Sequence, residues 1–174
     1  LAAGDAVGTT VEFKPPGSFP PVTDMVGGGV FHLRAGEWTD DTSMALCLAE
    51  SLIERRDFDP VDQMRRYLRW RDEAHLSSNG RLFDIGGTVS SSLRRFEASG
   101  DPFAGPTAVT SAGNGSIMRL APVPMAYAEW YRREGLYYRA AILMQRLPGV
   151  RSLAELARAG EPGSRAPYQA WPDE

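Results

Sequence analysis

The sequence of 174 residues predicts an all-α protein. Apolar residues recur at helical spacing in several long stretches, and clusters of Pro and Gly separate these stretches. No stretch shows sustained alternation of apolar and polar residues, and Thr107–Thr110 is too short to count as a strand. No repeat at a fixed period is visible. We therefore expect helices joined by loops.

Residues 1–12 are expected to form the first helix, in which two glycines one turn apart suggest close packing against a neighbour. A long irregular loop follows over residues 14–37, which contain two Pro pairs and a Gly triplet. The next helix begins after Thr39, a suitable N-cap. It ends near the two arginines at 55–56, whose charge suits a helix C-terminus.

Asp59 and Pro60 predict the start of another helix, with Asp as the N-cap and Pro at the first helical position. This helix is expected to fade near His75. Residues 77–86 are polar and predict a loop, and a helix through residues 90–96 follows. The middle of the chain therefore reads as two helices joined by a polar loop.

The last part of the predicted domain is less regular. A helix is expected to begin at Gly115 and run through Met118, and Pro122 and Pro124 are expected to interrupt it. A final helix is predicted from about residue 129 to residue 146.

Composition predicts a single helical domain over residues 1–147 and an irregular tail over residues 148–174, which is rich in Pro, Gly, Ser and Arg. The net charge of −3 gives no electrostatic signature of nucleic-acid binding. No apolar run approaches the roughly 20 residues of a membrane span, and no signal segment opens the chain. A single cysteine, Cys47, excludes an internal disulfide and is expected to be a buried apolar residue. We expect a cytoplasmic protein that binds neither nucleic acid nor membranes.

The segment 38–44, Trp-Thr-Asp-Asp-Thr-Ser-Met, carries the strongest functional signal. It can be read as an N-cap followed by acidic residues that suit the helix dipole. It can also be read as three oxygen ligands, from Thr39, Asp40 and Asp41, for Mg²⁺ or Mn²⁺. Consecutive helical residues point about 100° apart, so these three side chains can converge only at a helix start. Both interpretations place them there.

Three further motifs accompany this segment. The first is Gly-Asp-Ala-Val-Gly-Thr-Thr-Val-Glu-Phe over residues 4–13, and a weaker one is Phe-Asp-Ile-Gly-Gly-Thr over residues 83–88. The last, Ser-Ala-Gly-Asn-Gly-Ser-Ile-Met-Arg over residues 111–119, predicts a turn that leads into a helix N-terminus. Such a turn lets backbone N–H groups approach a phosphate, although Gly-Asn-Gly turns also occur without any ligand.

Taken together and in this order, the four motifs resemble the ADP-ribosylglycohydrolase family, metal-dependent hydrolases that remove ADP-ribose from proteins and include enzymes that act on dinitrogenase reductase. The resemblance implies an orthogonal helical bundle. It also implies a pair of Mg²⁺ or Mn²⁺ ions ligated in part by Thr39, Asp40 and Asp41. The implied partner is an ADP-ribosylated protein or a small molecule that contains ADP-ribose.

The resemblance also implies roles for individual residues. Glu12 is expected to be the general base, with Asp40 or Asp41 as the competing candidate. Asp5 is expected to support the site by orienting ligand groups. The residues expected to bind ADP-ribose belong to the two glycine-containing loops and are Asp84, Ile85, Gly86, Ser111, Gly113, Asn114 and Gly115.

The resemblance covers only the first half of a full-length member. A late Asp-x-Asp segment that completes the family's dinuclear site has no counterpart in this sequence, so we expect a bundle truncated on its C-terminal side. Two alternatives to hydrolysis stay open for that reason: a catalytically silent protein that binds ADP-ribose or a nucleotide, and a purely structural helical protein. Whether an N- or an O-glycosidic bond is cleaved also stays open.

Overall fold

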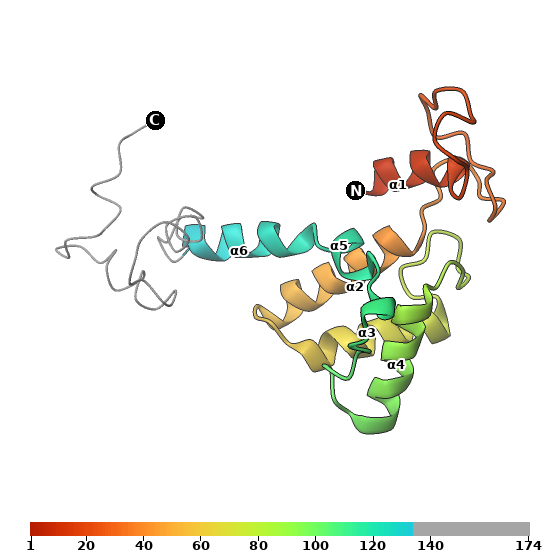
Figure 1. Cartoon of the computed structure of the whole chain (residues 1–174). Helices are drawn as coiled ribbons and strands as arrows, with labels where there is room; N and C mark the ends of the chain where they lie inside the picture. Colours follow the sequence, from red (N-terminus) through yellow and green to blue (C-terminus); the bar gives the residue numbers. More distant parts are fainter. Residues whose placement is uncertain (134–174) are drawn as a thin grey trace, which may run out of the picture. The chain divides into compact units, whose positions relative to one another are not determined.

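The computed structural model describes residues 1–133, and Figure 1 labels the helices. Residues 1–123 form one compact unit, and residues 124–133 are the described part of a second unit. The expected tail over residues 148–174 and most of the predicted final helix lie outside the described residues. The elements are α1 (Ala2–Gly8), η1 (Thr9–Val11), α2 (Asp40–Arg55), α3 (Pro60–Glu73), α4 (Gly87–Ser99), η2 (Val109–Ser111), α5 (Gly115–Met118) and α6 (Pro122–Arg133).

The all-α prediction is confirmed for the described residues, where helices alternate with loops and the only β pairing is one isolated bridge between Gly28 and Leu33. Asp59 caps α3 as expected, because its Oδ1 accepts a hydrogen bond of 2.9 Å from the backbone N–H of Asp62. Within these residues no helix is both long enough and apolar enough to cross a membrane.

Two helix starts differ from the sequence prediction. α4 begins at Gly87, three residues earlier than expected, and α6 begins at Pro122 rather than near residue 129. The prolines at 122 and 124 do not interrupt this helix. Both lie in its first turn, where the missing N–H groups would have had no intrahelical partner. The two prolines therefore mark a helix start.

The core of the first unit lies where α3 packs against α2 on one side and α4 on the other. α2 contributes an apolar stripe to it, and Cys47 is fully buried there, as predicted. The buried apolar side chains of this core are Met44, Ala45, Cys47, Leu48, Leu52, Tyr67, Trp70, Leu93 and Phe96. Packing of this kind fixes α2, whose first turn carries the Asp pair.

A buried ion network also joins α2 to α3. The Arg66 side chain, 8% exposed, forms ion pairs with Glu50, Glu54 and Asp62. Asp62 also accepts a hydrogen bond of 2.6 Å from Arg55. Burial by itself would raise the pKa of Asp62, but hydrogen bonds from Arg66 and Arg55 outweigh it and hold this pKa well below its usual range.

The long loop over residues 14–37 is irregular, as expected, and contacts η1 through two of its glycines. Gly29 has φ of +65°, and a Cβ atom built there would lie 2.5 Å from the backbone oxygen of Thr9. Thr10 Oγ1 also donates a hydrogen bond of 3.0 Å to the carbonyl oxygen of Gly27. The loop therefore supports the segment that leads to Glu12.

We expect Gly29→Ala to lower the free energy of unfolding by about 2–3 kcal/mol, because the new methyl group meets backbone that cannot move aside. Gly28→Ala is a matched control. Gly28 also has positive φ, at +83°, but faces open space. Gly28→Ala should therefore lower the free energy of unfolding by only about 1 kcal/mol. Urea unfolding measures both. Equal losses for the two variants would show that the close approach at Thr9 is unimportant.

Candidate active site

Asp5 in α1 caps the N-terminus of α2 from a distance of 34 residues in the sequence. Its carboxylate accepts hydrogen bonds from the backbone N–H of Thr39 at 3.0 Å and of Thr42 at 3.2 Å. It also accepts hydrogen bonds from the Thr39 hydroxyl at 2.9 Å and the Thr42 hydroxyl at 2.7 Å. Thr39 lies at the N-cap position, as predicted, but its own side chain makes no capping bond. A carboxylate in this place satisfies the helix N-terminus and fixes the direction of its first turn.

This arrangement leaves the Thr39 hydroxyl oxygen able to bind a cation. Because the hydroxyl proton points to Asp5, both lone pairs of Oγ1 remain as acceptors. Asp40 and Asp41 follow at once as the first two residues of α2. The three oxygen donors predicted from the sequence therefore share one helix start, and Asp5 orients the first of them.

Five carboxyl groups from three segments lie near this helix start. Partial burial, followed by the charges of Asp84, Asp41 and Asp5, raises the pKa of Glu12 to about 7. Burial and the charges of Asp84 and Asp41 raise the pKa of Asp40 to about 8, and Asp40 and Asp84 titrate as a hydrogen-bonded pair. The pKa of Asp41 is raised by burial and by the charges of Asp5 and Asp84. The charged neighbours behind these shifts are all carboxylates.

The donor set suits a hard divalent cation, which would relieve the repulsion between these carboxylates. Thr39, Asp40 and Asp41 are the residues that would hold it. Across residues 1–133, however, no three Asp, Glu, His or Cys side chains form a ready ligand cage. The metal site at the start of α2 therefore stays a prediction from the motif.

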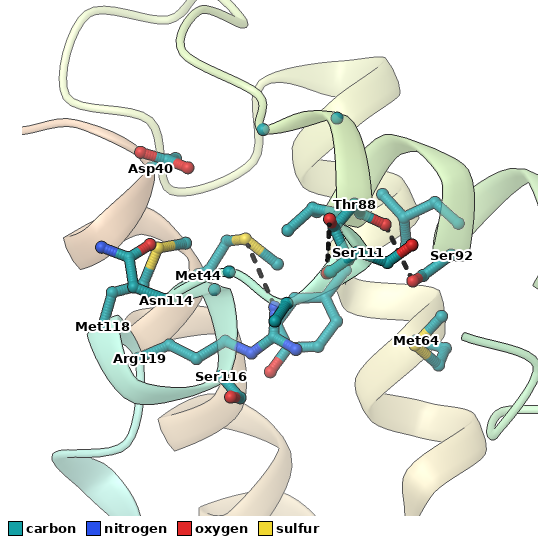
Figure 2. A pocket seen from close by; sticks show the side chains of 18 residues that line it. Asp40, Met44, Met64, Thr88, Ser92, Ser111, Asn114, Ser116, Met118 and Arg119 are labelled. Carbon is teal, nitrogen blue, oxygen red and sulfur yellow. Dashed lines mark hydrogen bonds between the residues drawn. The ribbon is translucent and has the colours of Figure 1, made fainter. Parts of the chain in front are cut away.

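A cavity of about 440 Å³ extends from Asp40 between the two glycine-containing loops (Figure 2). Met44, Met64, Tyr67 and Leu93 form an apolar part of its lining. Thr88 Oγ1 at the start of α4 donates a hydrogen bond of 3.0 Å to the carbonyl oxygen of Ser111, which joins the two loops. The cavity therefore has glycine-containing loops on one side and packed helices on the other.

A second, more open cavity of about 620 Å³ lies along α1. Asp5, Glu12, Thr39 and Asp41 line it, and Asn114 lines both cavities. The predicted general base Glu12 and the first predicted ligand thus face a common space. Asp40 therefore lines the first cavity, whereas Asp5, Glu12 and Asp41 line the second.

The residues predicted to bind ADP-ribose divide into two groups. Gly86 and four residues of the second loop, Ser111, Gly113, Asn114 and Gly115, line the first cavity. Asp84 instead pairs with Asp40, and Ile85 is not among the lining residues of either cavity. Sequence reasoning did not place Asp84 with the acidic residues, because no local pattern connects it to a helix start more than 40 residues away.

Arg119, to which the sequence assigned no role, also lines the first cavity and contacts side chains of the core. Its guanidinium carbon lies 4.7 Å from the centre of the Tyr67 ring, and its Nη1 donates to Met44 Sδ at 3.6 Å.

The fold and this site define an all-α protein with an acidic helix start that opens onto a glycine-lined cavity. The sequence model of the ADP-ribosylglycohydrolase family matches residues 1–148, and the chain belongs to this family. It is 47% identical over 136 residues to the ADP-ribosylarginine hydrolase Tri1 of Serratia proteamaculans (78% of this chain, 36% of the relative). It is 37% identical over 130 residues to ADP-ribosyl-[dinitrogen reductase] glycohydrolase of Rhodospirillum rubrum (72% and 42%).

A solved structure titled as an ADP-ribosylglycohydrolase-related protein complex has the same fold, with a TM-score of 0.61 and 48% identity over 78% of this chain and 42% of that one. The chain therefore spans well under half the length of these relatives. A shorter match of 54 residues, 56% identical, links the chain to the 3-deoxy-D-manno-octulosonic acid kinase of Xanthomonas axonopodis. It covers 31% of this chain and 21% of the kinase, which is too little to assign a second family.

Proposed function

We propose that this protein is a metal-dependent hydrolase that removes ADP-ribose from modified side chains by cleaving an N- or O-glycosidic bond. The observation that carries the proposal is that Asp40 lines the cavity walled by the glycine-containing loops, while the adjacent Asp41 lines the second cavity beside Glu12. The name of one relative, ADP-ribosylarginine hydrolase, favours arginine as the first acceptor to test.

Thr39, Asp40 and Asp41 are the residues that would hold Mg²⁺ or Mn²⁺. When bound, such an ion supplies Lewis-acid polarisation of substrate oxygens and a lowered pKa of water. Asp5 has a positioning role, because it fixes the Thr39 hydroxyl and the first turn of α2 through its four hydrogen bonds. In this scheme the ADP-ribose lies in the first cavity, against the backbone of residues 111–116.

Glu12 is the proposed general base, and Asp40 is the competing candidate. Glu12 lies in extended backbone just after η1, is half-buried, and lines the second cavity beside Asp41. A water molecule in that cavity could pass a proton to Glu12 while it approaches the anomeric carbon from the side of the acidic residues.

Glu12→Gln tests this assignment. We expect it to lower the rate of hydrolysis of an ADP-ribosylated arginine peptide in Mn²⁺ about a hundredfold or more, since the amide cannot accept the proton. The affinity for ADP-ribose should stay within about twofold of the wild-type value. Glu73→Gln, at the exposed end of α3, is the matched control. An unchanged rate in Glu12→Gln would exclude Glu12 as the base and leave Asp40.

One observation favours a second candidate function. In the part of the chain that the structure describes, no three Asp, Glu, His or Cys side chains form a ready ligand cage. A protein that binds ADP-ribose without hydrolysing it would use the first cavity alone. Such a protein would bind ADP-ribose equally well with and without Mn²⁺ and would release no ADP-ribose from a modified peptide.

A further inference from the structure

The side chain of Arg119 connects the end of α5 to two helices of the core. Its guanidinium group covers the ring of Tyr67 in α3 and contacts Met44 in α2, as the labelled side chains of Figure 2 show for Arg119 and Met44. Tyr67 and Met44 are 3% and 0% exposed. Among residues 1–133 no ion pair links Arg119 to a carboxylate. Its contacts are therefore with an aromatic face and a thioether, both of which are buried.

The glycine loop, residues 111–118, also packs against α2 through α5. The side chain of Ile117 is 72% exposed and that of the preceding Val109 is 92% exposed, so neither apolar side chain anchors it. The hydrogen bond from Thr88 holds the Ser111 end. At the other end, Arg119 is the residue that reaches the core. The two attachments thus bracket the part of the loop that lines both cavities.

We propose that Arg119 is a positioning residue that holds the glycine loop over the first cavity through Tyr67 and Met44. A cation over a desolvated aromatic face is a stronger contact than one in water, and it restricts the backbone that follows. A loop already held in its binding conformation loses less conformational entropy when a ligand binds. The expected effect of Arg119 on the affinity for ADP-ribose rests on the proposed function. Its effect on the order of the loop does not depend on that function.

Hydrogen exchange in the ligand-free protein tests the ordering directly. The amides of Ile117 and Met118 donate to the carbonyl oxygen of Asn114 at 2.7 and 2.9 Å and report on opening of α5. Arg119→Met should speed their exchange about tenfold, because it removes the contact with the aromatic face. Tyr67→Phe keeps that face and should stay within about twofold of wild type. Arg65→Met, an exposed position in α3, is the matched control. Wild-type exchange rates in Arg119→Met would overturn the proposal.

Calorimetry with ADP-ribose separates positioning from direct contact with phosphate. If Arg119 acts through Tyr67, Arg119→Met and Tyr67→Leu should weaken ADP-ribose binding by similar factors of about ten. Tyr67→Phe, which keeps the aromatic face, should bind ADP-ribose with nearly the wild-type affinity. Loss of affinity in Arg119→Met with none in Tyr67→Leu would mean that Arg119 binds the ligand itself, and would overturn positioning. Should the wild-type chain bind no ADP-ribose, the proposed function fails, and the exchange rates alone decide the role of Arg119.

Discussion

Replacing Arg66 with methionine is expected to lower the free energy of unfolding by about 3–5 kcal/mol, one of the largest losses available to a single change in this chain. Arg66 is the only cation that pairs with Glu50, Glu54 and Asp62 together within the described residues. Methionine would fill much of the space, but it would leave Asp62 buried with only its partner Arg55. A buried charge deprived of a partner keeps its desolvation cost.

The same variant should change how stability depends on pH. The native pKa of Asp62 lies below its unfolded value of about 4, so ionised Asp62 contributes stability at neutral pH that is lost as the pH falls through the lowered native value. Without Arg66 the native pKa rises, and the fall in stability below pH 4 should become shallower. Urea unfolding between pH 3 and pH 7 measures both effects. Arg65→Met should stay within about 0.5 kcal/mol of wild type, and an equally small change in Arg66→Met would contradict the account.

Asp5→Asn is expected to affect both stability and function. The carboxylate accepts four hydrogen bonds from Thr39 and Thr42. An amide has one acceptor oxygen and would present an NH₂ group to donors, so some of these bonds must break. We expect a loss of about 2–4 kcal/mol in the free energy of unfolding, from the lost cap and the lost charge-assisted bonds.

Metal affinity distinguishes a positioning role of Asp5 from that of an ordinary capping residue. Because the Thr39 hydroxyl would lose the partner that fixes its direction, Asp5→Asn should weaken Mn²⁺ binding about ten- to a hundredfold. Asp59→Asn is a matched control, since Asp59 caps α3 away from the site. It should lower stability slightly and leave metal affinity unchanged. A destabilised Asp5→Asn variant with normal metal affinity would restrict Asp5 to a structural role.

The sequence predicted those parts of the structure that local chemistry determines. The Asp-Pro pair at 59–60 identified the start of α3, and the Thr-Asp-Asp triplet identified the start of α2. The predicted start of α6 was wrong because its prolines were interpreted as helix breakers, although the first turn of a helix accepts proline.

Two features of the site depend on tertiary packing and had no local signal. Asp5 was expected to support the site, but nothing in its motif shows that it caps a helix 34 residues away. Asp84 was assigned to substrate binding with its loop, whereas the fold brings it beside Asp40. Both are single carboxylates in polar segments, where periodicity carries no information about distant partners.

Calorimetric titration of the purified chain with Mn²⁺, in the presence and absence of ADP-ribose, tests the central claim most directly. We expect wild-type protein to bind Mn²⁺ and to bind ADP-ribose more tightly when Mn²⁺ is present. We expect Asp40→Asn/Asp41→Asn to lose the metal binding and this coupling, while Asp72→Asn/Glu73→Gln, at the far end of α3, keeps both. Metal binding that survives in the Asp40/Asp41 double variant, or that is absent from the wild-type protein, would contradict a metal site at the start of α2.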